Sequence, residues 1–348
     1  MKHHAILITF TLILLIITSC SENSVKPAPE EKLCEITDTT SHDFTWRVDT
    51  LGLFPSALYD VAAIDENNVW AVGEIELSTG RYNAVKWNGS EYQYFQVFDN
   101  TGLPRIDVVL AFDTQNIWMF AGDRYHYLVG DSFITGNIKP GEAKGSTKAA
   151  WGLSSSDYYL VGDHGSISHY DGTSFELMES GTDKNLHDVT GYVDPETGIT
   201  HVWAAGELIL LHYDGSQWET VWDENNPVLP DNYNHPGAIF APNHKQLLVA
   251  AWYPQIIRGY CINSRDVTEF KEIFKVDLFA YAMDGPAIND FFIVGSWNKV
   301  AHFNGNSLRE YPEITGGSNR SVSYVNDKVF IVGPLAEQLG LFIHGTRN

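Results

Sequence analysis

Short apolar runs alternate with polar turns along most of the chain, and the runs recur at a regular distance. One apolar run in each repeat ends in Gly, or once in Ala, and successive endings lie 38 to 49 residues apart. Runs this short, bounded by turn residues, are typical of strands rather than helices. The seven endings fall at Gly73, Gly122, Gly162, Gly206, Ala250, Gly295 and Gly333.

Each of the first six repeats contains enough apolar runs for four strands, which we letter a to d along the chain. Residues 201–222 show three of them: VWAAG as strand b, LILLHY as strand c and QWETVW as strand d. The Asp214-Gly215 pair between strands c and d is a strong hairpin signal. Four strands in a period of about forty residues are typical of a β-propeller blade, so seven repeats predict an all-β, seven-bladed propeller. The predicted a strands are 58–64, 105–112, 148–153, 186–192, 237–241, 278–283 and 320–325.

The last repeat lacks a fourth strand, because the chain ends where its c–d turn should begin. The segment 44–51, FTWRVDTL, precedes the first a strand and alternates like the other d strands. We therefore expect this segment to complete the last blade and close the ring. Closure removes the exposed sheet edges of an open array.

The N-terminus predicts export. Lys2 precedes an apolar run that is too short to span a membrane and ends in small residues, as in a secretory signal peptide. The sequence Ile17-Thr18-Ser19-Cys20 resembles the bacterial lipobox, which implies cleavage before Cys20 and lipidation of its thiol. We expect a signal peptide over 1–19, a flexible polar tether over 20–43 and the propeller over 44–348. The expected location is the bacterial cell envelope, anchored to the outer membrane or cell surface.

The net charge indicates which classes of partner are disfavoured, and the cysteines indicate which disulfide could form. The net charge is −22, which disfavours nucleic acids and anionic lipid surfaces as partners. Two cysteines remain beside Cys20, and an exported compartment permits a disulfide between them. A Cys34–Cys261 bridge would fasten the tether to the propeller.

The repeats resemble bacterial seven-bladed propellers related to photosystem II stability and assembly factors, and more loosely the Asp-box (BNR) sialidase-like repeats. The resemblance rests on the VWAVG-type b strand and the DG-x-x-[WF] turn. The Asp box is met only in part by 169–176 and 212–219, because its leading Ser is absent. The resemblance implies the architecture and a preference for protein binding.

The candidate site lies on one of the two faces of such a ring. The a–b and c–d turns lie on one face, the turn face, and the longer b–c and d–a loops lie on the other, the loop face. Binding residues are concentrated on elaborated loops of a rigid scaffold, so we favour the loop face. Four acids follow b strands, and aromatic and basic residues lie near them in the sequence. The ligand-binding candidates are Glu74, Asp123, Arg124, Tyr125, His126, Asp163, His164, Glu207, Trp252, Tyr253 and Trp297.

Other polar residues have structural interpretations beside functional ones. Asp60, Asp107 and Asp188 recur in the a strands, where backbone hydrogen bonding is favoured over catalysis. Four histidines in strand c lie in four different blades and cannot converge on one metal ion. The loop 223–235 is rich in oxygen ligands but lacks the spacing of a Ca²⁺ loop. The four histidines are His169, His212, His302 and His344.

Catalytic motifs are missing from the sequence, including a phosphate loop, a nucleophile elbow and an HExxH helix. We therefore predict a monomeric, lipid-anchored propeller that binds a protein or a glycan, without a cofactor or metal. A carbohydrate-active enzyme, a glycosidase or lyase using carboxylates at the channel mouth, is the alternative. A structural surface protein without a ligand is the third interpretation.

Overall fold

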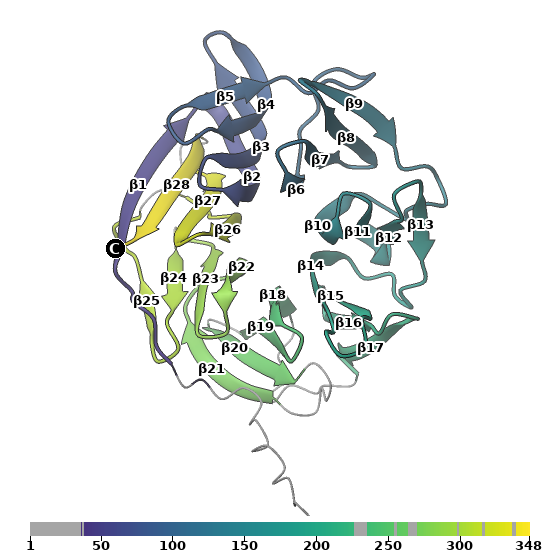
Figure 1. The fold of residues 1–348 in the computed structure, drawn as a ribbon, viewed down its shortest axis with the longest axis vertical. Coiled ribbons are helices and arrows are strands. Elements are labelled where there is room, and N and C mark those ends of the chain that lie inside the picture. Colours follow the sequence, from purple (N-terminus) through teal and green to yellow (C-terminus); the bar gives the residue numbers. More distant parts are fainter. Residues whose placement is uncertain are drawn as a thin grey trace, which may run out of the picture. The chain divides into compact units, whose positions relative to one another are not determined.

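The computed structural model describes Ile36 and residues 38–225, 235–253, 256–263, 270–297, 299–314, 317–335 and 339–348. These residues form seven four-stranded antiparallel sheets that are arranged in a ring (Figure 1). The first strand of each repeat faces the centre of the ring. The predicted all-β, seven-bladed propeller is confirmed.

Blades 1 to 6 are each made of four consecutive strands. Blade 1 contains β2(Leu53–Asp65), β3(Asn68–Leu77), β4(Gly80–Trp87) and β5(Tyr92–Phe95), and blade 2 contains β6(Val108–Asp113), β7(Asn116–Ala121), β8(Arg124–Val129) and β9(Ser132–Asn137). Blade 3 contains β10(Thr147–Ser154), β11(Asp157–Gly162), β12(Ile167–Tyr170) and β13(Phe175–Met178), and blade 4 contains β14(Leu186–Val193), β15(Thr200–Gly206), β16(Ile209–Tyr213) and β17(Trp218–Asp223). Blade 5 contains β18(His235–Asn243), β19(Gln246–Tyr253), β20(Ile256–Asn263) and β21(Phe270–Val276), and blade 6 contains β22(Ala280–Ala287), β23(Asp290–Gly295), β24(Val300–Phe303) and β25(Leu308–Glu310).

Blade 7 is assembled from both ends of the chain. It contains β26(Ser321–Val325), β27(Lys328–Pro334) and β28(Gly340–Arg347), with β1(Phe44–Leu51) as its outer strand. β1 pairs with β28 in register from Phe44 opposite Arg347 to Leu51 opposite Gly340. The predicted closing strand 44–51 is confirmed at both of its bounds.

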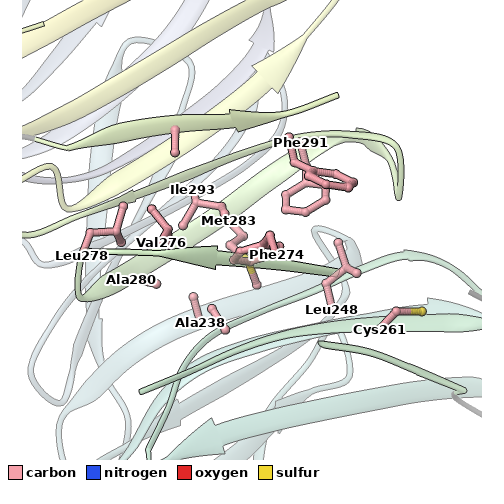
Figure 2. Close-up of a cluster of buried hydrophobic side chains, with 13 residues drawn as sticks. Ala238, Leu248, Cys261, Phe274, Val276, Leu278, Ala280, Met283, Phe291 and Ile293 are labelled. Carbon is pink, nitrogen blue, oxygen red and sulfur yellow. The ribbon is translucent and has the colours of Figure 1, made fainter. Parts of the chain in front are cut away.

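The core lies between neighbouring blades rather than inside one sheet. One cluster combines Leu248 and Cys261 of blade 5 with Met283, Phe291 and Ile293 of blade 6 (Figure 2). All six residues of β23 are buried. A b strand covered on both faces needs apolar side chains on both, which explains the continuous apolar runs of the repeat.

Carboxylates on three inner strands join adjacent blades. One carboxylate oxygen accepts the N–H of the following residue in its own strand, and the other accepts an N–H from the inner strand of the next blade. The bonds between blades are Val109 N to Asp60 Oδ2 at 2.8 Å, Ile239 N to Asp188 Oδ2 at 2.8 Å and Tyr324 N to Asp284 Oδ2 at 2.7 Å.

These inter-blade bonds support the backbone-bonding interpretation of Asp60 and Asp188. Asp107 differs, because it precedes the first residue of β6, and its carboxylate pairs with Arg105 at 2.8 Å. The Asp60 and Asp188 carboxyl groups are surrounded by the inner strands, although both also line the central channel. Burial raises the pKa of Asp60 to about 6 and that of Asp188 to about 7.

The N-terminal segment is bound to the ring before β1 begins. Thr40 N donates to Asn304 O and Asn304 Nδ2 donates to Thr40 O, both at 2.9 Å. His42 Nδ1 lies 2.8 Å from His302 Nδ1 of β24. Asn304 belongs to the c–d turn of blade 6, so the chain joins the ring on the turn face. The predicted flexible tether of 20–43 is therefore wrong for 38–43.

The predicted signal peptide 1–19 and Cys20 lie outside the described residues. Within the described ranges, no helix has the length and apolar character needed to cross a membrane.

Candidate functional site

The centre of the ring is a channel of about 390 Å³ lined by the inner strands. Its walls carry the inter-blade carboxylates and small apolar side chains. Polar and aromatic side chains gather where the inner strands meet the b–c turns, on the loop face. The mouth residues of the channel are Tyr59, Asp107, Lys148, His187, Tyr281 and Arg320.

A second hollow of about 470 Å³ lies beside this mouth, and we call it the mouth pocket. It shares Tyr59 and Arg320 with the channel, so the two spaces adjoin. The pocket combines side chains of opposite charge with an aromatic ring. Its lining residues are Pro55, Ser56, Ala57, Tyr59, Glu74, Ile75, Glu76, Arg81, Arg320 and Pro334.

One wall of the mouth pocket is a β-hairpin where the sequence predicted a loop. β3 continues past Gly73 to Leu77 and β4 starts at Gly80, so the two strands replace most of the longer b–c loop expected in the first repeat. The alternation Glu74-Ile75-Glu76-Leu77 sustains the strand, because Ile75 is buried while the glutamates are partly exposed. A register shift between Val72 and Ile75 accompanies the extension.

Charges on this wall form a small network. Arg81 lies 3.7 Å from Glu74 Oε1 and 3.4 Å from Glu76 Oε2. Tyr59 donates its hydroxyl to Glu74 Oε2 at 3.4 Å. Burial, with the Glu74 carboxylate beside it, raises the pKa of Tyr59 above its usual value, so this hydroxyl stays neutral and available as a donor. Glu74, a predicted candidate, is thus placed in the pocket.

Two arginines that precede the inner strands β6 and β26 lie beside aromatic rings near the pocket. The Arg105 guanidinium lies 4.9 Å from the centre of the Tyr59 ring and pairs with Asp107 at 2.8 Å. The Arg320 guanidinium lies 4.6 Å from the centre of the Tyr281 ring. Cations over aromatic faces are held by the ring quadrupole, which fixes their position. The loop face therefore holds guanidinium groups near its centre although the chain is strongly acidic.

The other acids that follow b strands do not join Glu74. Asp163 pairs with Lys148 at 3.2 Å, and Glu207 lies 3.9 Å from His187 and accepts from Asn185 Nδ2. Asp123 lines a separate hollow of about 320 Å³. All four acids lie on the loop face, but they do not line one hollow, because Asp163 and Glu207 contact local partners and Asp123 lines a hollow of its own.

Three candidates in blade 2 serve the fold. Arg124 pairs with the buried Asp99 of the d–a loop and fastens that loop to blade 2. Tyr125 packs against Trp118, and His126 is fully buried with its Nδ1 2.8 Å from Thr135 Oγ1. The turn before β8 has only two residues, since Ala121 pairs with Arg124. β8 starts directly after this turn and carries His126 into the core, so its place among the ligand-binding candidates is corrected.

The remaining candidates are dispersed. His164 is exposed in a tight turn at φ 57°, and its N–H donates to Asn185 Oδ1. Trp297 is 61% exposed and contacts Phe279 at the edge of blade 6, where it lines a hollow of about 240 Å³ that is distinct from the mouth pocket. Trp252 and Tyr253 end β19, and their side chains lie outside the described part of the structure.

The histidines of strand c contact side chains of their own blade or of the adjacent one. His302 is fully buried and lies 2.7 Å from Asp290 Oδ1, and His169 lies 2.8 Å from Asp157 Oδ1. His344 lies 2.7 Å from the Tyr92 hydroxyl. Burial lowers the pKa of His344 and of His212 to about 4, so both are neutral at pH 7.

The described residues contain no group of three or more His, Cys, Asp or Glu side chains that could hold a metal ion. Most of the predicted oxygen-rich loop 223–235 lies outside them. Cys261 is buried and disulfide-bonded.

Sequence reasoning missed the residues that make the mouth pocket, apart from Glu74. The sequence places Arg320 at the start of an inner strand and gives no sign that Arg81 lies beside Glu74. The usable signal was the polar-apolar alternation over 74–77, which continues strand b beyond its glycine.

Comparisons with known proteins support the fold. No protein-family model and no curated protein sequence matches the chain. A structure of YCF48 bound to D1 peptide is 13% identical with a TM-score of 0.64, covering 90% of this chain and 100% of that one. A streptogramin B lyase is 13% identical with a TM-score of 0.65, covering 86% and 97%. The WD40 propeller domain of Doa1 is 11% identical with a TM-score of 0.61, covering 88% and 98%. At these identities the similarity shows a seven-bladed propeller that is used for varied functions.

Proposed function

We propose that this propeller is a binding module that takes a peptide segment of a protein partner into the mouth pocket on the loop face. The observation that carries the proposal is the pocket itself, a 470 Å³ hollow at the end of the central channel. It is lined by two carboxylates, two guanidinium groups and a tyrosine.

Chemistry around the pocket supports a peptide rather than a small apolar ligand. Glu74 and Arg81 supply acceptors and donors for a polar chain, and Tyr59 supplies both a ring and a hydroxyl. Leu53 and Phe54, which precede the pocket residue Pro55, are 53% and 67% exposed. Exposed apolar residues beside a polar pocket are a common feature of protein-binding surfaces. The structurally similar YCF48 has a structure with a bound D1 peptide, which supports a peptide as the ligand proposed here.

The arrangement favours binding over glycoside hydrolysis. A glycosidase places two carboxyl groups on opposite sides of the scissile bond, one of them protonated. Here Glu74 and Glu76 both lie on the β3–β4 hairpin and both contact Arg81. Two carboxylates that contact one guanidinium on a single wall do not lie on opposite sides of a substrate.

A hexapeptide array tests the proposal. Three proteins are incubated with the array: the natural chain, a Glu74→Gln/Arg81→Gln variant and an Arg47→Gln variant. Arg47 lines a hollow on the turn face and lies over Trp87, so it is a matched control on the other face. The pocket variant should lose at least about 10-fold in affinity for the selected peptides, and the control should not. Equal affinity of all three proteins, or loss in the control alone, would overturn the proposal.

We further propose that the chain is anchored in a bacterial envelope through a lipid on Cys20. The folded part supports this arrangement, because residues 38–43 join the ring on the turn face and leave the mouth pocket on the opposite face. In a bacterial host, the natural chain should fractionate with membranes and Cys20→Ser should not. Membrane association of both chains would contradict lipidation at this residue.

A further inference from the structure

We infer that Arg320 recognises the free C-terminal carboxylate of the bound peptide. This inference rests on the proposed function and specifies which end of the peptide enters the pocket. Arg320 is the residue immediately before β26, it is exposed, and it lines both the mouth pocket and the channel.

Arg320 differs from most of the described arginines in having no ion pair with a carboxylate. Among arginines with described side chains, five form ion pairs with carboxylates, and only Arg309 and Arg320 do not. In a chain with 44 acidic and 22 basic residues, an exposed arginine at a pocket without a carboxylate partner is unusual. The five paired arginines are Arg47, Arg81, Arg105, Arg124 and Arg347.

The position of the guanidinium suits an external carboxylate. Its carbon lies 4.6 Å from the centre of the Tyr281 ring, so the ring covers one face of the group. A guanidinium held this way keeps N–H donors at its edge for a bidentate bond to a carboxylate. Less side-chain entropy is lost on binding when the donor is already held.

Neighbouring charges set the direction of the ligand. The cations that flank Arg320 at the mouth are already satisfied, because Arg105 pairs with Asp107 and Lys148 pairs with Asp163. Glu74 and Glu76 lie on the β3–β4 hairpin that forms a wall of the same pocket. A peptide with its carboxylate at Arg320 therefore presents its preceding residues to an acidic wall, which favours a basic or polar residue there.

The probe is a library of hexapeptides randomised at the last three positions and synthesised in two forms, with a free carboxylate and with a C-terminal amide. Affinities are measured for the natural chain, Arg320→Gln and Arg309→Gln. Arg309 is a matched control, since it also lies over a tyrosine without a carboxylate partner but on the outer strand β25. Far-ultraviolet circular dichroism and melting temperature verify that each variant is folded, and Arg320→Lys and Tyr281→Leu serve as second variants.

The expected result is that free-acid peptides bind about 10- to 100-fold more tightly than their amides, because the amide lacks the charged hydrogen bond to Arg320. Arg320→Gln should abolish this preference, Arg320→Lys and Tyr281→Leu should reduce it, and Arg309→Gln should leave it intact. Equal binding of acid and amide would overturn the carboxylate inference and leave peptide binding standing. Binding of neither form would overturn both. Arg320-dependent binding of acidic oligosaccharides, tested in parallel, without peptide binding would show that the ligand is a glycan.

Discussion

Closure of the ring by β1 can be tested at Phe44. This side chain of the closing strand is 8% exposed and packs against blade 6. Its ring centre is 5.1 Å from that of Phe292 and 6.4 Å from that of Tyr311. Substitution of a buried Phe by Ala costs about 3–5 kcal/mol, because the transfer free energy is lost and a cavity remains. We expect Phe44→Ala to lower the free energy of unfolding by that amount.

The assay is equilibrium unfolding in urea followed by tryptophan fluorescence. Val48→Ala is the matched control, because Val48 lies in the same strand opposite Ile343 but is 42% exposed. Its substitution should cost about 1 kcal/mol or less. Limited proteolysis should also cleave the Phe44→Ala chain sooner before β1. If Phe44→Ala costs no more than Val48→Ala, β1 does not close the ring in the way described.

Three further outcomes follow from buried groups. Asp188→Ala removes the acceptor of two backbone N–H groups from adjacent blades and should lower the free energy of unfolding by about 2–4 kcal/mol at pH 5. Asp107→Ala, at an ion pair on the channel rim, should lower it by less than about 1 kcal/mol. Equal losses in urea titrations would refute the role of Asp188 in joining the blades. Burial raises the pKa of Asp188 to about 7, so the folded chain prefers the neutral carboxyl. The free energy of unfolding of the natural chain, measured relative to that of Asp188→Asn, should therefore fall as the pH rises from about 4 to 7. A rise over this range would contradict the prediction. Non-reducing peptide mapping should join Cys261 to Cys34, whereas a bond to Cys20 would exclude lipidation there.

The sequence predicted the architecture because each blade repeats the same local pattern. Strand b needs apolar residues on both faces, and an Asp-Gly or Asn-Gly pair marks most c–d turns. The pairing of 44–51 with β28 is long-range in sequence, yet it could be predicted, because one blade lacked a strand and one segment alternated like the missing strand.

The site was predicted less well because it depends on where strands end. The acids after the b strands share a sequence position, but each turn directs its acid to a different neighbour, such as Lys148 for Asp163. A two-residue turn places His126 in the core. Arg81 and Tyr59 meet Glu74 because β3 continues beyond a register shift between Val72 and Ile75, and nothing in the local pattern fixes that shift.

Hydrogen–deuterium exchange with a bound peptide tests the central claim, that the mouth pocket on the loop face is the binding site. The tightest free-acid hexapeptide is added to the natural chain at saturating concentration, and exchange is mapped by mass spectrometry. Protection is predicted over 55–59, over the hairpin 74–82 and around Arg320, with no change in the blade 1 turns 66–67 and 88–90 on the opposite face. Protection confined to those turns would contradict the account.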